Sequence, residues 1–524
     1  MGQERELKFR IEPALHAAVL SHPVLATLAP PPRTQLLQSW YFDTADHRLR
    51  QARMALRVRD ADDGRRLLCL KSSGSPERPQ ARGEWEFPVA GNAPTDADLA
   101  RLGDTPLAAV GGAGELAGSL APTLGTRVRR TVWTVEWEGA RLEVCLDAGD
   151  ALGGASDDAP RLPISELEIE LRDGDWMAAF DLAWALAQDL PLHLSPGSKA
   201  ELAARAAGLA PLRLPALARE LPQHATVGNA IATVLQQSLA LVAVGAELLA
   251  VDPQAETVHQ MRLQLRRLRV LLRLLESVGP KSLARTCRWL RAEWRWAGQL
   301  LGAVRDVDVC REFAQSLREA APDAPQSAAA LAQSLENKRT ARVQALNAYL
   351  GGARFGRLLL AQARWAEDWA GGGVRLHAAP SVADLARRLL RFHDDELPSL
   401  RAKHWDMLLA TWDANARTPS DAPWAELHRL RLRAKQRRYA LEWLRPWVDD
   451  ALGARAAAWL RLSDGLQTDL GQALDTLRLA RWTGDSGPLP TAEAAALRER
   501  WTALAFSQAR SGLDRARRTA KSAA

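Results

Sequence analysis

Residues 4–11 read ERELKFRI, and charged and apolar side chains alternate along this stretch. Successive side chains of a β-strand point to opposite faces, so a strand here places Glu4, Glu6 and Lys8 on one face and apolar residues on the other. Charges of both signs therefore share one face. Such a face is either the solvated side of an antiparallel sheet or the lining of a site.

The same alternation recurs before residue 175. Arg57 and Arg59 alternate with apolar residues, and so do Glu166, Glu168 and Glu170. Further strands are expected at 38–42, 66–71, 83–89, 129–137 and 141–148, with helices at 13–28, 96–102 and 176–190. Many antiparallel strands with few helices predict an α+β fold built on an antiparallel sheet with surrounding helices, and this sheet is either a closed β-barrel or strongly curved.

Closure of this sheet would turn the charged strand faces into the lining of a lumen. Clustered carboxylates are hard oxygen ligands that suit Mg²⁺ or Mn²⁺. The cations that would face a polyanion are Arg57, Arg59, Lys71, Arg82 and Lys199. A divalent metal and many cations around one cavity indicate phosphate chemistry.

Length and charge indicate more than one module. A chain of 524 residues suggests two to four domains. Residues 1–210 hold 23 basic and 30 acidic residues, and residues 211–524 hold 46 and 32, so an acidic part precedes a basic part. No uninterrupted apolar run of 18 residues and no signal-peptide pattern occur, and the four cysteines lack C-x-x-C spacing. We therefore expect a cytoplasmic protein without a membrane partner.

From about Val227 onward the apolar residues follow a helical period, with breaks at proline and glycine clusters. A proline-rich segment separates the two patterns. The expected domains are 1–207, a linker at 208–223, an all-α domain at 224–515 and a basic tail at 516–524.

The helical half contains an internal repeat with an offset of 169 residues. Its first copy comprises His259, Arg262, Arg266 and Arg269, and its second copy comprises His428, Arg431, Lys435 and Arg438. Leu301-Gly302 and Asp306 return at the same offset as Leu470-Gly471 and Asp475. A constant offset over about fifty residues predicts a duplicated helical bundle. Each basic set occupies one helical stripe, which is either a solvated face or an anion-binding surface.

The ordered motifs of the first half resemble the CYTH domain of the triphosphate tunnel metalloenzymes over about residues 1–205. The motifs that carry this resemblance are Glu4-x-Glu6-x-Lys8, Tyr41-Phe42-Asp43-Thr44, Leu56-Arg57-Val58-Arg59, Leu70-Lys71, Arg82-x-Glu84, Asp147, Glu166-x-Glu168-x-Glu170 and Ser198-Lys199. The second half resembles the CHAD domain, a conserved-histidine α-helical module, over about 224–515. This match rests on the His259 and His428 repeats and on Leu301-Gly302-x-x-Arg305-Asp306. The order of the two domains is that of bacterial inorganic triphosphatases.

The CYTH resemblance implies an eight-stranded tunnel that binds a linear triphosphate with Mg²⁺ or Mn²⁺. It implies metal binding by Glu4, Glu6, Asp147, Glu166, Glu168 and Glu170, and a catalytic set of Glu4, Glu6, Lys8, Glu168 and Glu170. It implies phosphate contacts by Lys8, Arg57, Arg59, Lys71, Arg82, Arg130 and Lys199. Water would attack in line and release pyrophosphate and orthophosphate from tripolyphosphate.

The CHAD resemblance implies binding of long-chain polyphosphate by both basic stripes, and an association with polyphosphate granules. Three alternatives remain at this stage. The chain could be a non-catalytic polyphosphate adaptor, an enzyme that acts on an organic triphosphate (a thiamine triphosphatase or a nucleotide cyclase), or, less favoured, a nucleic-acid-binding protein.

Overall fold

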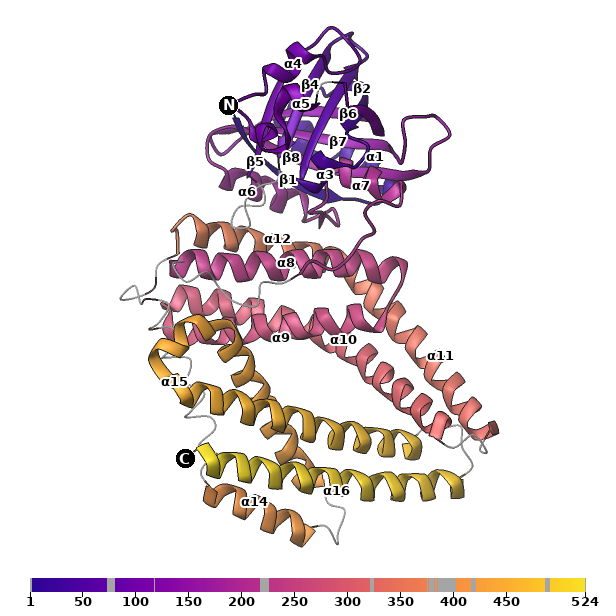
Figure 1. Cartoon of the computed structure of the whole chain (residues 1–524), viewed down its shortest axis with the longest axis vertical. Coiled ribbons are helices and arrows are strands. Elements are labelled where there is room, and N and C mark those ends of the chain that lie inside the picture. The colour runs from indigo at the N-terminus through magenta and orange to yellow at the C-terminus, as the bar shows by residue number, and fades with distance from the viewer. Residues whose placement is uncertain are drawn as a thin grey trace. The chain divides into compact units, whose positions relative to one another are not determined.

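The computed structural model describes residues 2–72, 81–116, 118–216, 226–320, 325–374, 376, 381, 384, 402–415, 421–485 and 491–523 (Figure 1). The predicted site residues Glu4 and Arg82 are described by their backbone alone. The chain divides into two compact units. The first comprises Met1–Pro215, Val242–Leu248 and Tyr349–Glu367, and the second comprises Ala216–Leu241, Leu249–Ala348 and Asp368–Ala524.

The first unit contains a single antiparallel sheet. Its strands are β1 (Gly2–Arg10), β2 (Arg33–Asp43), β3 (Met54–Ala61), β4 (Arg66–Ser72), β5 (Ala81–Pro88), β6 (Ala121–Trp137), β7 (Ala140–Leu152), β8 (Arg161–Asp173) and β9 (His193–Leu194). The strand order is β5-β4-β3-β2-β6-β7-β8-β1-β9, and β1 also pairs with β5. Because β1 pairs with both β8 and β5, strands β1–β8 form a closed ring, in agreement with the eight-stranded tunnel that the family resemblance implies.

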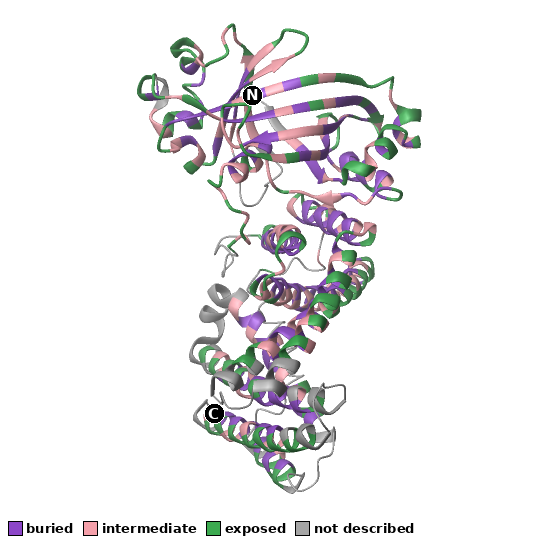
Figure 2. Ribbon diagram, turned by 90° about the vertical axis from the view of Figure 1, so that its right-hand side faces the viewer, coloured by how far each residue is buried: buried purple, intermediate pink, exposed green. Residues whose placement is uncertain are grey.

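The outer faces of the strands are apolar and pack against short helices. These helices are η1 (Pro13–Leu15), α1 (His16–Leu20), α2 (Pro23–Leu28), α3 (Arg48–Gln51), α4 (Asp96–Ala100), η2 (Pro106–Val110), α5 (Gly112–Leu116), α6 (Met177–Leu186) and α7 (Lys199–Ala206). Leu56, Val58, Leu68 and Leu70 of the sheet, for example, pack with Leu99 of α4 in one buried cluster. Buried residues run along the strands of this unit (Figure 2), and from Leu37 to Tyr41 of β2 buried and partly exposed residues alternate. Burial of the apolar face therefore leaves the charged face to the inside of the ring.

The helices of the second half are α8 (Val227–Val251), α9 (Ala255–Val278), α10 (Lys281–Ala320), α11 (Pro325–Leu350), α12 (Ala353–Ala370), α14 (Ala402–Asn415), α15 (Asp421–Asp485) and α16 (Thr491–Ala523). By length and composition, α8 is apolar enough to cross a membrane. However, 67% of its most apolar window is buried inside the protein, as in a core helix. The hydrophobicity of α8 is thus accounted for by packing.

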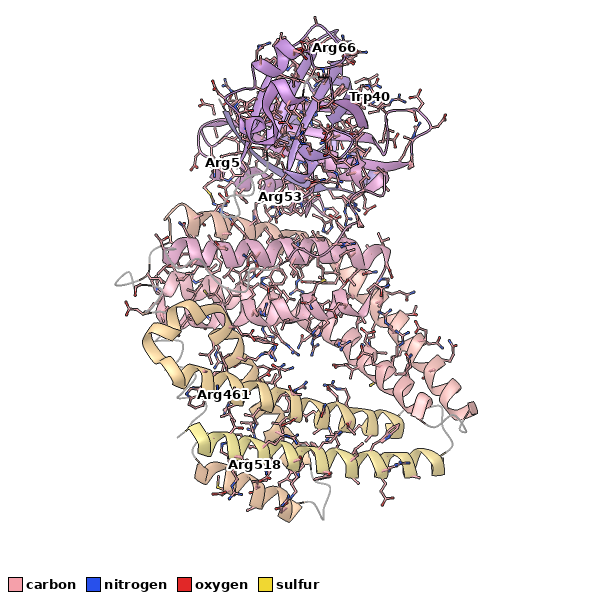
Figure 3. All side chains as sticks on the ribbon, viewed as in Figure 1. Arg5, Trp40, Arg53, Arg66, Arg461 and Arg518 are labelled. Carbon is pink, nitrogen blue, oxygen red and sulfur yellow. The ribbon has the colours of Figure 1, made fainter. Side chains whose placement is uncertain are left out.

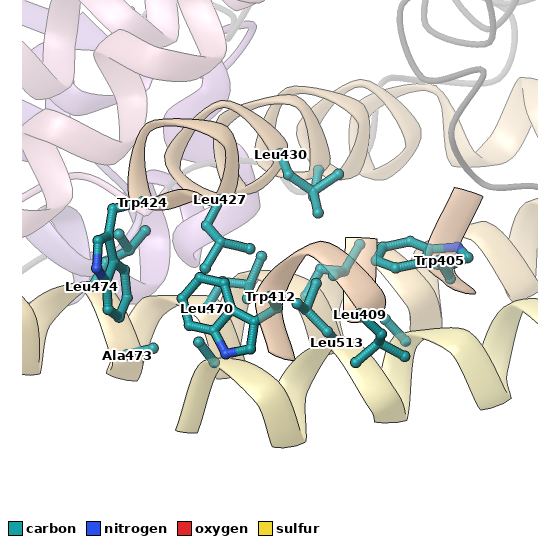
Figure 4. Packing of buried hydrophobic residues seen from close by; sticks show 14 of the residues in the cluster. Trp405, Leu409, Trp412, Trp424, Leu427, Leu430, Leu470, Ala473, Leu474 and Leu513 are labelled. Carbon is teal, nitrogen blue, oxygen red and sulfur yellow. The ribbon is translucent and has the colours of Figure 1, made fainter. Parts of the chain in front are cut away.

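Helix α15 bends back on itself. Leu427 and Leu430 belong to the same buried cluster as Leu470 and Leu474, together with Trp412 of α14 (Figure 4). A straight helix would separate residues 427 and 470 by about 65 Å. The two parts of α15 therefore correspond to α9 and α10, as expected from the 169-residue offset. The turn between α9 and α10 at residues 279–280 corresponds to residues 448–449 of α15.

Two parts of the predicted domain division look different in the structure. Helix α16 continues to Ala523, and Ala516 and Ala520 are buried, so residues 516–523 form part of a packed helix rather than a tail. Segments of α8, α11 and α12 belong to the same compact unit as the sheet. Arg5 of β1 contacts Glu367 of α12 at 3.1 Å, because odd-numbered residues of β1 face away from the lumen. Of the predicted linker, residues 208–216 are described and lie outside helices and strands.

Candidate functional site

The register of the sheet brings the predicted charged residues to one wall. In the β1–β8 pair, Lys8 lies opposite Glu168, and Glu6 lies opposite Glu170. In the β7–β8 pair, Asp147 lies opposite Glu166. Directly opposed residues of antiparallel strands share a face, so these side chains all line the lumen.

Three carboxylates gather around the Lys8 ammonium. Its Nζ lies 3.2 Å from Glu168 Oε1 and 3.9 Å from both Glu6 Oε1 and Glu166 Oε2. All four side chains are buried. Burial alone would lower the pKa of Lys8, but Glu6, Glu168 and Glu166 outweigh it and raise the pKa. Lys8 therefore remains a charged group inside the tunnel.

A second cation, Lys199, lies on the same wall although it comes from the first turn of α7. Its Nζ lies 2.6 Å from Glu168 Oε1, 2.7 Å from Asp147 Oδ2 and 2.9 Å from Glu166 Oε2. Ser198 caps this helix, which fixes its first residue at the lumen. A cation is unfavourable at a helix N-terminus, so the three carboxylates hold Lys199 in place.

Arg130 of β6 completes the network. Its guanidinium donates to both oxygens of Asp147, at 2.8 and 2.6 Å, and to Glu168 Oε2 at 2.6 Å. Burial would raise the pKa values of Asp147 and Glu168, but Lys199, Arg130 and, for Glu168, Lys8 lower both. Both carboxylates are therefore ionised at neutral pH.

The opposite strands β3, β4 and β5 carry the basic wall. Lys71 Nζ lies 3.2 Å from Glu84 Oε1, and an Arg57 nitrogen lies 4.0 Å from the same oxygen. The pKa of Arg59 is lowered to about 10 by burial and by the neighbouring charges of Arg57 and Arg130. Arg59 is thus surrounded by cations, and a bound anion would stabilise its charge.

Three further predicted residues are Glu170, Glu4 and Arg82. Glu170 Oε1 accepts from Arg172 at 2.7 Å, and Arg172 also contacts Glu143 at 2.8 Å. Glu4 and Arg82 are opposed in the β1–β5 pair, but their side chains lie outside the described residues. The roles of these three residues stay predictions.

Prediction from the sequence missed two residues beside the basic wall, Cys69 and Glu86. Potential ligand atoms of Cys69, Glu84 and Glu86 all lie within 4.8 Å of one another, and the Cys69 thiol donates to Glu84 at 3.1 Å. Burial raises the pKa of Cys69 to about 11, so the thiol is protonated. The signal was available, because Cys69 precedes Lys71 by two residues and Glu86 follows Glu84 by two.

The donor set of the acidic wall fits a hard divalent cation. Glu6, Glu166 and Glu168 offer carboxylate oxygens that already converge on one positive charge, that of Lys8. Carboxylates of this kind bind Mg²⁺ or Mn²⁺. A triphosphate bridging the two walls would meet metal ligands on one side and arginine and lysine on the other.

In the second unit, the repeated basic residues lie on helices α9 and α15, which contact each other. Arg267 of α9 lies 3.3 Å from Glu442 of α15, and nitrogen-tipped side chains extend into the space between these ribbons (Figure 3). In each repeat, a glycine without a side chain leaves space for the guanidinium group of one stripe arginine. A Cβ at Gly302 would clash with the Arg262 guanidinium, and a Cβ at Gly471 would lie 3.0 Å from Arg431.

The two stripes differ in how far carboxylates neutralise them. Arg438 contacts Glu442 at 3.3 Å and Asp464 at 2.7 Å, and Arg431 lies 3.8 Å from Asp475. In the part of the chain that the structure describes, the following stripe residues form no ion pair: His259, Arg262, Arg266, Arg269, His428 and Lys435. The first stripe is thus the less neutralised one.

A missed arginine links the two repeats. Arg478 lies 3.1 Å from Asp306 and 3.3 Å from Asp475, which are equivalent positions of the repeat. Its own equivalent in the first repeat is Val309, so the repeat pattern gave no signal for it.

Similar solved structures cover each half separately. A candidate adenylyl cyclase from Hippeastrum, described as having a dominant triphosphatase activity, is 22% identical. It covers 38% of this chain and 95% of its own, with a TM-score of 0.29. The CHAD domain from Ricinus communis is 24% identical and covers 58% of this chain and 96% of its own, with a TM-score of 0.41.

Sequence comparison assigns both halves. The inorganic triphosphatase of Haemophilus influenzae is 30% identical over 203 residues, which are 38% of this chain and 54% of that protein. The chain thus spans about half the length of that relative. A family model of the CYTH domain matches residues 2–203, and one of the CHAD domain matches residues 233–484. The chain therefore contains a CYTH domain at residues 2–203 followed by a CHAD domain at residues 233–484.

Proposed function

We propose that the tunnel hydrolyses inorganic triphosphate to pyrophosphate and orthophosphate in a reaction that depends on Mg²⁺ or Mn²⁺. The observation that carries this proposal is the pairing of an acidic wall with a basic wall across one closed ring. Pure anion binding would not require Glu6, Asp147, Glu166 and Glu168 to be buried together. The similarity to an inorganic triphosphatase supports the same substrate class.

The residues of the chain have distinct roles in this proposal. Arg57, Arg59 and Lys71 bind the phosphate oxygens and stabilise negative charge on the leaving group. Glu6, Glu166 and Glu168 would hold the divalent ion, which supplies charge neutralisation and lowers the pKa of bound water.

The ammonium groups on the acidic wall have a second task. Lys8 and Lys199 neutralise the carboxylates in the free protein and would bind phosphate oxygens of the substrate. Arg130 holds Asp147 and Glu168 in their ionised form. The walls thus stay charged and in register between turnovers.

Phosphate release from tripolyphosphate tests the proposal. The full chain is assayed with Mg²⁺, with Mn²⁺ and with EDTA, and ATP and thiamine triphosphate are offered as competing substrates. We expect metal-dependent release that Glu6→Gln abolishes and that Glu12→Gln, at an exposed position shortly after the same strand, leaves intact. Binding of triphosphate without turnover would overturn the enzyme proposal and leave a polyphosphate adaptor. Preferential turnover of an organic triphosphate would overturn the assigned substrate.

We further propose that the CHAD domain binds long-chain polyphosphate along α9 and α15, in the cytoplasm and at polyphosphate granules. Unneutralised arginines at successive helical turns support this, because a phosphate chain releases counterions when such a surface binds it. Arg266→Gln should weaken polyphosphate binding in a salt-dependent manner. Arg433→Gln removes the same charge from an exposed position of α15 outside the stripe and should have little effect. Equal loss in both variants would contradict a defined surface.

A further inference from the structure

One member of the basic surface on α9 and α15 differs from the rest in burial and chemistry. Lys435 is only 8% exposed, although it is a lysine without a carboxylate partner. In the described part of the chain it takes part in no hydrogen bond or ion pair. A largely buried lysine side chain is an unfavourable place for an uncompensated positive charge, so this position calls for an explanation.

The groups that surround Lys435 are mostly cations. Arg266 and Arg262 of α9 act electrostatically on Lys435, and Arg431 precedes it by four residues on the same face of α15. Asp475, in the second part of α15, is a carboxylate that favours the charged form of Lys435. The same carboxylate lies 3.8 Å from Arg431 and 3.3 Å from Arg478. Like charges at these positions repel a positive charge on Lys435.

The repeat shows that this position carries a different residue in each copy. Lys435 is equivalent to Arg266 at the 169-residue offset. A guanidinium stays protonated under all physiological conditions, whereas a buried lysine can lose its proton. Of the four clustered cations Arg262, Arg266, Arg431 and Lys435, only the lysine can relieve the repulsion in this way.

We propose that Lys435 is uncharged in the free protein and takes up one proton when a polyphosphate chain binds to this surface. The inference rests on the proposed polyphosphate binding and states that one proton is taken up together with the polyphosphate. The incoming phosphates supply the negative charge that the protein itself does not provide. Without the anion, an uncharged Lys435 reduces the repulsion among the neighbouring arginines. With the anion bound, protonated Lys435 adds its positive charge to the binding surface.

The direction of the shift in the free protein agrees with this arrangement. Burial, followed by Arg266 and Arg431, lowers the pKa of Lys435 to about 6. At pH 7 about a tenth of such a group is protonated, so binding takes up close to one proton. The affinity should then fall about tenfold between pH 7 and pH 8, because one proton is linked to binding.

The two repeat histidines are the other groups of this surface that could take up protons. Burial and neighbouring charges lower the pKa values of His259 and His428, and Arg305 of α10 acts on His259. Both side chains are exposed, unlike that of Lys435. A variant in which both are replaced by glutamine therefore separates their contribution from that of Lys435.

Titration calorimetry of the full chain with long-chain polyphosphate tests the inference. Enthalpies are measured at pH 7 and constant salt in two phosphate-free buffers that differ in ionisation enthalpy. We expect an uptake close to one proton for the wild type and for His259→Gln/His428→Gln. We expect almost none for Lys435→Arg, which binds with its charge already in place, or for Lys435→Met, which binds more weakly.

The outcomes distinguish this inference from the function on which it depends. No polyphosphate binding by the wild type would overturn the proposed function itself. Binding without buffer-dependent enthalpy would overturn the proton uptake alone. Uptake that persists in both Lys435 variants, with folding verified by circular dichroism, would assign the proton to another group and likewise refute the inference.

Discussion

Lys199 offers a direct test of the acidic wall, because one side chain neutralises three buried carboxylates. Its Nζ lies within 3 Å of an oxygen of each of Asp147, Glu166 and Glu168. Asp147 is fully buried, and Glu166 and Glu168 are each 7% exposed. Lys199→Met removes the charge and leaves Lys8 and Arg130 as the cations that contact these carboxylates among the described residues.

Removal of one partner from a buried ion pair destabilises a protein by about 3–5 kcal/mol, since the other charge stays buried. For a domain of this size, such a loss lowers the melting temperature by roughly 6–20 °C. The effect should depend on pH. In the wild type the pKa values of Asp147 and Glu168 are lowered, so their contribution is complete above the unfolded pKa near 4 and is lost as the pH falls further. In the variant these pKa values rise, and its stability should instead decrease as the pH increases toward neutrality.

The assay is thermal unfolding of the full chain at pH 7.5 in EDTA, repeated with Mg²⁺ or Mn²⁺. A divalent ion should stabilise Lys199→Met more than the wild type, because it replaces the missing positive charge. Lys281→Met, at an exposed lysine in the first turn of α10, serves as the control. A melting temperature in EDTA equal to that of the wild type, with no extra gain from metal, would refute the reasoning.

Two further substitutions test other parts of the structure. Gly302→Ala should displace the Arg262 guanidinium and weaken polyphosphate binding, whereas Gly298→Ala on the same helix has open space around the new Cβ and should leave binding unchanged. Equal affinities for the two variants in a calorimetric titration would contradict a positioning role of the glycine. Arg5→Glu should lower the melting temperature of the sheet-containing unit and raise the metal concentration needed for half-maximal activity. The second substitution Glu367→Arg should partly restore the melting temperature and the metal requirement. If the double variant matches Arg5→Glu alone in both quantities, the Arg5–Glu367 contact is not the cause of the changes.

Much of the fold could be predicted because the spacing of charged and apolar residues within single strands and helices can be read from the sequence. The alternation at residues 4–11 identifies a strand with a charged face, and the 169-residue offset identifies the duplicated bundle. The helix predicted at residues 13–28 forms as three short pieces: η1 continues directly into α1, and Pro23 begins the separate helix α2. The predicted basic tail is helical because small residues at 516 and 520 pack against the bundle.

The sequence by itself therefore determined which residues face a common side and which residue types the two sites contain. The tertiary structure decided which charges meet. Lys199 and Arg130 reach Asp147 and Glu168 because the register aligns the neighbouring strands β6, β7 and β8 with the start of α7. Likewise, Arg266 and Lys435 are equivalent in the repeat, but only the packing of α9 against α15 leaves Lys435 buried among cations. Side-chain periodicity is a property of single elements, whereas ion pairing and proton affinity depend on distances between elements far apart in the chain.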